Sequence, residues 1–269
     1  MPLLHLVLIA VIQGITEFLP ISSSGHLILL PGLTSLDDQG QLIDVAVHVG
    51  TLFAVMLYFR ADVAVAIGGL GRLVRGKVDT HGARLAIGLI ASTGPVMAVG
   101  FMLHATGLDQ QMRSVAVIGW TMLIFGLVLY WADQTGSERK TIENWRFRDA
   151  VAMGLWQAVA LIPGTSRSGI TITGGRQLGY GREEAARIAM LMSIPTIIAS
   201  GALLGLDVVE AGDWTLAQDA VLAAALAFGA ALGALALMMR LLKSVSFTPY
   251  VIYRVILGVG LLIYAYGWL

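Results

Sequence analysis

Residues 13–26 read QGITEFLPISSSGH, and they interrupt an apolar stretch with a carboxylate, a proline, three serines and a histidine. Residues 157–169, QAVALIPGTSRSG, have the same order: apolar residues, a proline, and then hydroxyl side chains that end near glycine. A proline inside an apolar run ends or kinks a helix, because it lacks an N–H donor and clashes with the preceding turn. The two stretches therefore predict two interrupted helices.

The composition places these interruptions in a membrane. The chain has 269 residues, of which 57% are hydrophobic and 13% are charged, and its mean hydropathy is +0.80. So much apolar surface excludes an ordinary soluble domain and indicates a polytopic helical membrane protein. The absence of cysteine excludes disulfides and thiolate metal sites. Residues 1–20 lack a basic n-region and an A-x-A-like cleavage site, so we expect this segment to be retained.

Helix lengths give the number of membrane crossings. A spanning helix needs about 20 mostly apolar residues. Six stretches meet this requirement: 42–59, 85–104, 114–132, 187–206, 219–239 and 250–269. The pieces beside the two prolines are too short, since residues 151–162 would extend only about 18 Å against a hydrocarbon core of ~30 Å, and residues 24–33 still less. We predict an all-α polytopic membrane protein with six transmembrane helices and two re-entrant helical hairpins; two kinked spanning helices are the alternative.

The positive charges give the orientation. Four connecting segments, 60–84, 133–149, 176–187 and 240–249, carry fourteen of the seventeen Lys and Arg residues. The opposite segments, 34–41, 105–113 and 207–218, carry only Arg113. Because cytoplasmic loops are enriched in Lys and Arg, the first group is predicted to be cytoplasmic, and both termini external.

The chain also repeats weakly, and each interrupted stretch is followed by three predicted spans. Because three is an odd number, the second repeat must lie upside down relative to the first. We predict one integral membrane domain, 1–269, with repeat one at about 1–132, a linker at 133–149 and an inverted repeat two at about 150–269. The hairpins then enter from opposite faces, and their tips meet within the membrane.

The first interruption carries acid–base and nucleophilic groups. Gln13 and Glu17 are four residues apart and share one helix face, and an ionisable residue at membrane depth is a functional candidate by default. If the next helix starts near Ser22, then Ser23 and His26 also share a face. A Glu–Ser–His grouping offers a nucleophile beside an acid/base and its orienting group. The alternative is that Glu17 lies near an interface and only caps the next helix.

The second interruption favours an anion. Arg167 lies at the expected start of a helix, where free N–H groups and the helix dipole attract negative charge, and its guanidinium matches phosphate oxygens. The alternative is that Arg167 pairs with a buried carboxylate such as Glu17. A lipid-walled site that opens outward suggests a phosphorylated lipid. The residues predicted to bind it are Gln13, Ser22, Ser24, Gly25, Gly164, Thr165, Ser166, Ser168 and Thr171.

These motifs resemble those of the undecaprenyl pyrophosphate phosphatase family, the bacitracin-resistance type, over essentially the whole chain. The resemblance rests on QGITEFLPISSSGHLIL (13–29), VHVGTLFAV (47–55), PGTSRSGITIT (163–173) and FTPYVIYR (247–254). It implies hydrolysis of undecaprenyl diphosphate to undecaprenyl phosphate and inorganic phosphate on the outer face of the bacterial cytoplasmic membrane. This reaction recycles the carrier lipid of cell-wall synthesis and confers resistance to bacitracin.

The resemblance also assigns residues. It places the family's acidic motif on Gln13 and Glu17, its serine and histidine on Ser23 and His26, and its phosphate-binding arginine on Arg167. Gln13 departs from the pattern, because many members carry Glu there. A divalent cation, Mg²⁺ or Ca²⁺, is expected to accompany the diphosphate, and no organic cofactor or protein metal site is predicted. The expected partners are the polyprenyl diphosphate and the bilayer, without nucleic acid; a homodimer stays open.

Several alternatives remain open at this point. Inverted repeats with broken helices are also typical of carriers, so the alternative function is a polyprenyl-phosphate flippase or a small-anion transporter. The nucleophile is either Ser23 or water. His48 and Arg254 lie within predicted spans and are expected to border the site.

Overall fold

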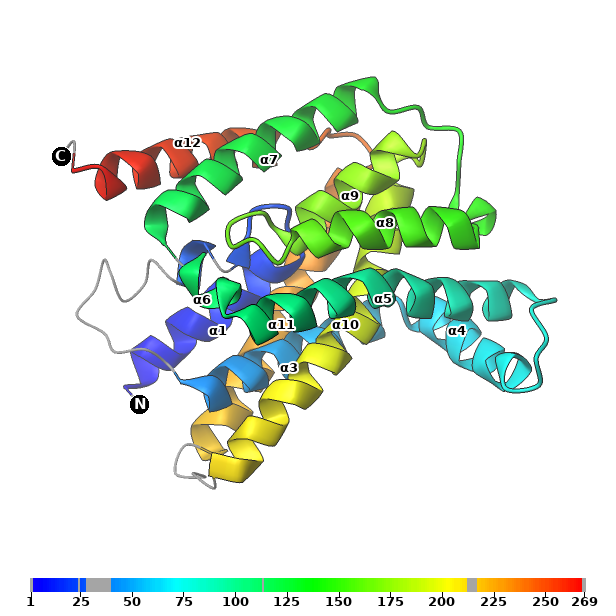
Figure 1. Ribbon diagram of the computed structural model, residues 1–269, viewed down its shortest axis with the longest axis horizontal. Helices are drawn as coiled ribbons and strands as arrows, with labels where there is room; N and C mark the ends of the chain where they lie inside the picture. The colour runs from blue at the N-terminus through cyan, green and yellow to red at the C-terminus, as the bar shows by residue number, and fades with distance from the viewer. Residues whose placement is uncertain (1, 24, 28–39, 113, 212–216, 268–269) are drawn as a thin grey trace.

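The computed structural model describes residues 2–23, 25–27, 40–112, 114–211 and 217–267, and this part of the chain folds into helices without a strand (Figure 1). The helices are α1 (Leu3–Phe18), α3 (Gln41–Tyr58), α4 (Arg60–Leu73), α5 (His81–Thr106), α6 (Leu108–Gln111), α7 (Val115–Thr135), the 3₁₀ helix η1 (Ile142–Asn144), α8 (Phe147–Val159), α9 (Arg167–Gln177), α10 (Arg182–Ala211), α11 (Ala217–Leu241) and α12 (Thr248–Ala265).

The prediction of six membrane-spanning helices is confirmed. In the described residues, α3, α5, α7, α10, α11 and α12 are long and apolar enough to cross a membrane. Helices α5, α10 and α11 extend beyond both predicted ends into polar residues that an apolar window does not include, and the ends of α3, α7 and α12 agree with the predicted ones within a few residues. The chain is therefore a multi-pass membrane protein.

Both proline-containing stretches interrupt helices. Helix α1 ends at Phe18, and Leu19 is extended (φ −68°, ψ 143°), as a residue before proline prefers. Helix α8 ends at Val159 rather than at the predicted residue 162, because the chain tightens into i→i+3 hydrogen bonds before Pro163. Its 13 residues extend only about 20 Å. Most of the predicted helical piece 24–33 lies outside the described residues.

Small residues let the helices around α11 approach closely. A Cβ atom on Gly14 of α1 would lie 2.7 Å from the carbonyl oxygen of Ala227, and one on Gly50 of α3 would overlap the backbone of Ala224. Without a hydrophobic driving force inside lipid, such close contacts are a main source of helix association. They hold both α1 and α3 against α11, and α1 and α3 also contact each other.

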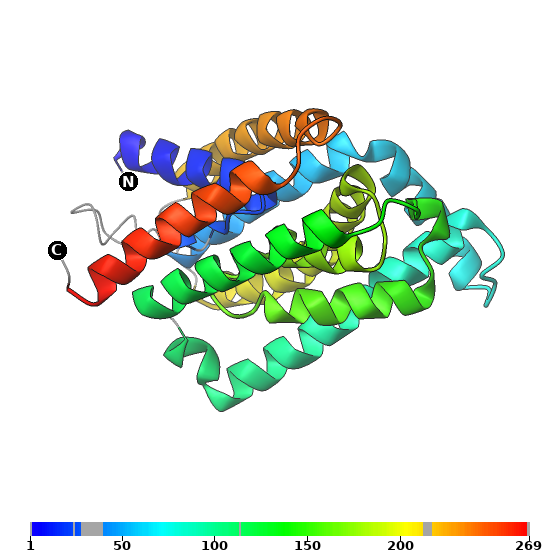
Figure 2. The same ribbon diagram turned by 90° about the horizontal axis from the view of Figure 1, so that it is seen from above.

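The two ends of the molecule differ. The start of α1 and the end of α12 lie at one end, whereas α4 extends from the other, where α8 also begins (Figures 1 and 2). Helix α4 falls within the predicted loop 60–84. It was not predicted because it is mostly exposed and too polar to cross a membrane, so the search for spans does not detect it.

Candidate active site

The two interruptions border one cavity of about 310 Å³ inside the bundle. Its walls come from α1, α3, α5, α8, α9, α10 and the segments after α1 and α8. The lining residues are Glu17, Ser22, Ser23, His48, Val96, Gln157, Ala160, Leu161, Ser166, Arg167, Thr196, Ile197 and Ser200. Polar side chains from both interruptions thus face a common space surrounded by apolar helices.

The backbone is unusual at the same point of each interruption. Ser22 and Ser166 have φ values of 73° and 70°, and they are the non-glycine residues with positive φ in the described part of the chain. Each lies directly before a helical residue, and the Ser166 hydroxyl accepts a hydrogen bond (3.2 Å) from the N–H of Gly169. Such conformations cost about 1–3 kcal/mol each and cluster at functional sites.

Glu17 connects the two interruptions. Its Oε2 atom accepts hydrogen bonds from Gln13 Nε2 (2.8 Å) and from the Ser23 hydroxyl (3.0 Å). Its Oε1 atom accepts a hydrogen bond from the Arg167 guanidinium, which forms an ion pair with it. The carboxylate is buried, whereas the arginine keeps partial access to the cavity. The structure therefore brings together four of the predicted site residues: Gln13, Glu17, Ser23 and Arg167. It also shows the ion pair between Arg167 and Glu17 that the sequence analysis gave as the alternative to an anion site.

His26 is not among the residues that line the cavity, and its contacts are with other groups. Its Nδ1 atom lies 2.7 Å from the carbonyl oxygen of Ser22, and its Nε2 atom lies 2.5 Å from the hydroxyl of Tyr253 in α12. The two rings are nearly parallel, with their centroids 5.6 Å apart. Both ring nitrogens are thus engaged by groups other than Glu17 and Ser23, so the catalytic role of His26 stays a prediction.

Of the remaining predicted binding residues, all but Ser24 lie among the described residues. Gly25, Gly164, Thr165, Ser168 and Thr171 are buried close to the two breaks, and Ser24 lies outside the described residues. The Ser168 hydroxyl donates to the carbonyl oxygen of Leu19 (2.9 Å) and so ties the breaks together. The hydroxyls of Thr165 and Thr171 are buried without a hydrogen-bond partner.

Arg254 braces both interruptions from α12. It is fully buried, and its guanidinium donates to the carbonyl oxygens of Thr165 (2.9 Å), Gly164 (3.2 Å) and Pro20 (3.4 Å). These bonds hold the irregular backbone that would otherwise lack partners inside the membrane. An arginine in an apolar helix is visible in the sequence and indicates a buried polar contact. Its partners could not be predicted, because they lie far from Arg254 along the chain.

The cluster does not fit a resident divalent cation. Glu17 is the single carboxylate in the cavity lining and already pairs with Arg167, and the buried Oε1 atom of Gln13, which has no partner, adds one neutral oxygen. The described residues contain no group of three or more His, Asp or Glu side chains that could hold a metal ion. Ca²⁺ takes about six to eight oxygen ligands, far more than these residues supply, and Mg²⁺ is usually held by waters, substrate phosphates and one or two carboxylates, whereas the one carboxylate here is paired with Arg167.

The comparison with protein families adds a finding that is independent of this geometry. The model of a family described as "Bacitracin resistance protein BacA" matches residues 6–260. The chain belongs to the BacA family. Its relatives include proteins named undecaprenyl-diphosphatase from Dinoroseobacter shibae (70% identical) and Roseobacter denitrificans (68%), each over 99% of this chain and 100% of the relative. A more distant one, from Chromohalobacter salexigens, is 45% identical over 97% of this chain and 98% of its own.

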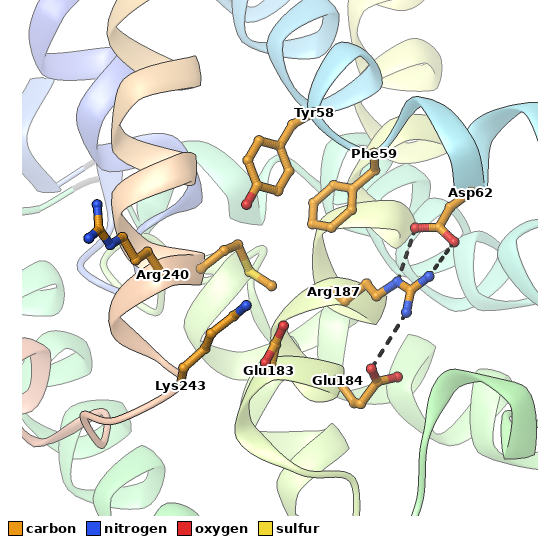
Figure 3. Close-up of a pocket in the computed structure, with 9 residues that line it drawn as sticks. Tyr58, Phe59, Asp62, Glu183, Glu184, Arg187, Arg240 and Lys243 are labelled. Atoms are coloured by element: carbon orange, nitrogen blue, oxygen red, sulfur yellow. Dashed lines mark hydrogen bonds and ion pairs between the residues drawn. The ribbon is translucent and has the colours of Figure 1, made fainter.

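This BacA-family chain has a second cavity, of about 320 Å³, near the end where α4 extends (Figure 3). It is lined by Tyr58, Phe59, Asp62, Glu183, Glu184, Arg187, Met239, Arg240 and Lys243. Arg187 forms two hydrogen bonds with Asp62 (2.6 and 3.0 Å) and an ion pair with Glu184 (3.5 Å). The ion pairs of Arg187 with Asp62 of α4 and Glu184 of its own helix therefore join α4 to α10 at this cavity.

Proposed function

We propose that the chain hydrolyses undecaprenyl diphosphate to undecaprenyl phosphate and inorganic phosphate, and so recycles the cell-wall carrier lipid and confers bacitracin resistance. The observation that carries the proposal is the contact of Ser23 and Arg167 with the two oxygens of one buried carboxylate, Glu17. A hydroxyl nucleophile, a base and a phosphate-binding guanidinium are the groups that a phosphoryl transfer needs. The names of the close relatives support the same reaction.

In the proposed mechanism, Arg167 exchanges Glu17 for the terminal phosphoryl group, and the first N–H groups of α9 add hydrogen bonds to its oxygens. Glu17, released from Arg167, accepts the proton of Ser23. The Ser23 oxygen forms a bond to the terminal phosphorus, the bridging P–O bond breaks, and undecaprenyl phosphate leaves. Water then attacks the phosphoserine and releases inorganic phosphate. Direct attack by water on the diphosphate is the competing route.

We also propose that the two interruptions are tips of re-entrant hairpins related by an inverted repeat. The segments SSSG (22–25) and SRSG (166–169) match when Ser22 is aligned with Ser166, and both serines have the same unusual φ. Helix packing supports this relation. If repeat two, about 150–269, inverts repeat one, about 1–132, then α1, α3, α5 and α7 correspond to α8, α10, α11 and α12. The contact of α1 with α11 then corresponds to the contact of α8 with α5, and α3 with α10 and α7 with α12 are contacts between corresponding helices.

The site is proposed to open to the external side of the cytoplasmic membrane. The clustering of Lys and Arg on the opposite loops supports this orientation. Because the cavity residues do not fit a resident cation, any Mg²⁺ or Ca²⁺ is proposed to arrive bound to the diphosphate. No step of the mechanism depends on it.

A carrier is the second candidate, and the paired helix packing is the observation that favours it. Phosphate release by the purified full-length chain in detergent, without a membrane gradient, distinguishes the two. A hydrolase releases phosphate from undecaprenyl diphosphate under these conditions, whereas a carrier releases none. Ser23→Ala measured in parallel should abolish release if serine is the nucleophile, and substantial residual turnover would favour direct attack by water.

A further inference from the structure

His48 lies in α3 and lines the cavity together with Glu17, Ser23 and Arg167. About a third of its side chain, 34%, is exposed. Glu17, from α1, and Arg167, from α9, are the other titratable side chains in the cavity lining. On α3 itself, Asp44 is a titratable residue that lies one helical turn before His48.

The hydrogen bonds of His48 fix its tautomer. Its Nδ1 atom lies 2.7 Å from the carbonyl oxygen of Asp44. A carbonyl oxygen only accepts, so Nδ1 must carry a proton. Its Nε2 atom lies 3.2 Å from Gln13 Nε2, which also donates to Glu17. Because turning the Gln13 amide over would place its oxygen against the Glu17 carboxylate, the amide nitrogen is the donor. His48 Nε2 is therefore the acceptor, and its single lone pair, which receives the Gln13 N–H, is the position at which the ring can gain a proton.

This lone pair lies close to the path of the Ser23 proton. His48 Nε2 is 4.0 Å from Glu17 Oε2, the same oxygen that accepts the Ser23 hydroxyl at 3.0 Å. When Arg167 turns to a phosphate, Glu17 loses its positive partner inside a low-dielectric site, where an unpaired charge is costly. An imidazole that gains a proton at this position becomes a new positive partner for Glu17.

We propose that His48 is the final acceptor of the proton that Ser23 loses, acting through Glu17 as a positioning residue that does not touch the substrate. The proposal rests on the proposed phosphatase function with Ser23 as nucleophile. In the first half-reaction the proton moves from Ser23 to Glu17 and on to His48 Nε2 as the Ser23–phosphorus bond forms and undecaprenyl phosphate leaves. In the second, the same proton returns to the Ser23 oxygen as its bond to phosphorus breaks, and both protons of the attacking water leave with the phosphate.

The test compares His48→Gln with the wild-type chain in detergent on undecaprenyl diphosphate. Glutamine can still accept the hydrogen bond of Gln13, but it cannot hold a proton. We expect kcat to fall about 100-fold, which is typical of a lost acid–base group, whereas KM stays within about twofold because the side chain does not bind the substrate. His104→Gln, an exposed histidine outside the cavity, is the matched control and should retain wild-type activity.

The pH profile gives the readout that a structural role would not change. A histidine that must accept a proton works only while it is unprotonated, so its loss should change the acidic side of the kcat profile, whereas a structural loss lowers kcat by the same factor at every pH. The diphosphate also titrates, so His48 accounts only for the part of the acid limb that His48→Gln loses. An unchanged acid limb, or a kcat within twofold of wild type, would overturn the proposal.

Two controls separate the possible failures. If the wild-type chain releases no phosphate, the proposed function fails, whereas an active wild type with an unaffected His48→Gln refutes only the role of His48. Thermal denaturation in detergent reports whether the variant folds. If His48→Gln unfolds, the smaller His48→Asn carries the same expectations for kcat, KM and the acid limb.

Discussion

Glu17 accepts hydrogen bonds from three different side chains, and this sharing determines what each of them can do. As long as Arg167 pairs with the carboxylate, the pair neutralises itself inside the membrane. Removing one member of a buried ion pair costs about 3–5 kcal/mol, because the other charge remains without a partner. A phosphate that takes over the guanidinium avoids this cost for Arg167, so an anionic ligand is the natural trigger for releasing Glu17.

Arg167→Lys tests the guanidinium. A lysine keeps the charge but presents a point charge instead of a fork of donors, so it cannot hold two phosphoryl oxygens in one plane. We expect kcat/KM for undecaprenyl diphosphate to fall about 100-fold, roughly the loss of one strong transition-state interaction. Arg240→Lys, at an exposed position of α11, should leave phosphate release unchanged. Turnover of Arg167→Lys close to wild type would exclude a bidentate role.

Glu17→Gln and Gln13→Ala separate the base from its neighbour. An amide at position 17 cannot take the Ser23 proton, so we expect kcat to fall by at least about 100-fold. Gln13→Ala removes one of the three donors to Glu17 and the contact with His48 Nε2, and it should cost about 30-fold or less, the effect of two hydrogen bonds of roughly 1 kcal/mol each. If Gln13→Ala proves the more damaging substitution, Glu17 is not the base.

The residues of the site were predictable to different degrees. Glu17, Ser23 and Arg167 stand out in the sequence, because polar and ionisable side chains at membrane depth are costly and therefore rare in an apolar stretch. The direction of His26 was not predictable, since it depends on Tyr253, 227 residues away. The contact of His48 with Gln13 likewise depends on how α3 packs against α1, which helix periodicity alone does not specify.

At the scale of elements, glycines set how closely α1 approaches α11. A Cβ atom on Gly14 would lie 2.7 Å from a carbonyl oxygen of α11 and 2.7 Å from Ala230 Cβ, whereas one on Gly233 of α11 would meet nothing within 4 Å. We expect Gly14→Ala to lower the stability in detergent by about 1–3 kcal/mol through overpacking. Gly233→Ala should be neutral or slightly stabilising, because alanine favours helix. Thermal denaturation of both variants measures the difference, and equal melting temperatures would contradict the close packing.

The connection between α9 and α10 is anchored by Tyr180. Its hydroxyl donates to Asp149 Oδ2 (2.6 Å), and burial together with this carboxylate raises the pKa of the Tyr180 hydroxyl. The unfolded chain ionises its tyrosines at about pH 10, whereas the folded chain keeps Tyr180 protonated. This contribution to stability is therefore complete below about pH 10 and is lost as the pH rises further.

Tyr180→Phe is expected to lower the melting temperature at pH 8, because Asp149 loses a donor at a cost of about 1 kcal/mol. The gap between wild type and Tyr180→Phe should narrow above about pH 10 as the wild-type chain loses the contribution. Tyr264→Phe, at an exposed position of α12, serves as the control and should show neither effect. A gap that widens at alkaline pH would contradict this sign.

The elements themselves show what a sequence can predict in a membrane. The six spans were predictable because only a helix of about 20 apolar residues crosses the hydrocarbon core with all its backbone groups paired. Helix α4 was not, because a mostly exposed helix beside the membrane needs no long apolar run. The end of α8 was placed three residues too late, since a 3₁₀ turn before Pro163 leaves no separate signal in the composition.

At the scale of the whole molecule, the distribution of positive charge assigns the two ends to opposite sides of the membrane. The end with the start of α1 and the end of α12 is proposed to be external, and the end with α4 to be cytoplasmic (Figure 1). This orientation decides which pool of lipid diphosphate reaches the cavity. It therefore affects the biological role of the site more than any single side chain does.

Single cysteines test the orientation directly, because the chain contains no cysteine of its own. Gln41→Cys and Thr106→Cys lie at exposed positions near the proposed external end, and Val74→Cys and Ser244→Cys at exposed positions near the proposed cytoplasmic end. A membrane-impermeant maleimide should label the first two in cells whose outer membrane is permeable and whose cytoplasmic membrane is intact, and the last two only after lysis. The reverse pattern would place the cavity opening on the cytoplasmic side, and labelling of all four in intact cells would contradict the alternation of the spans. Phosphate release by each variant in detergent shows that the labelled protein has the native fold.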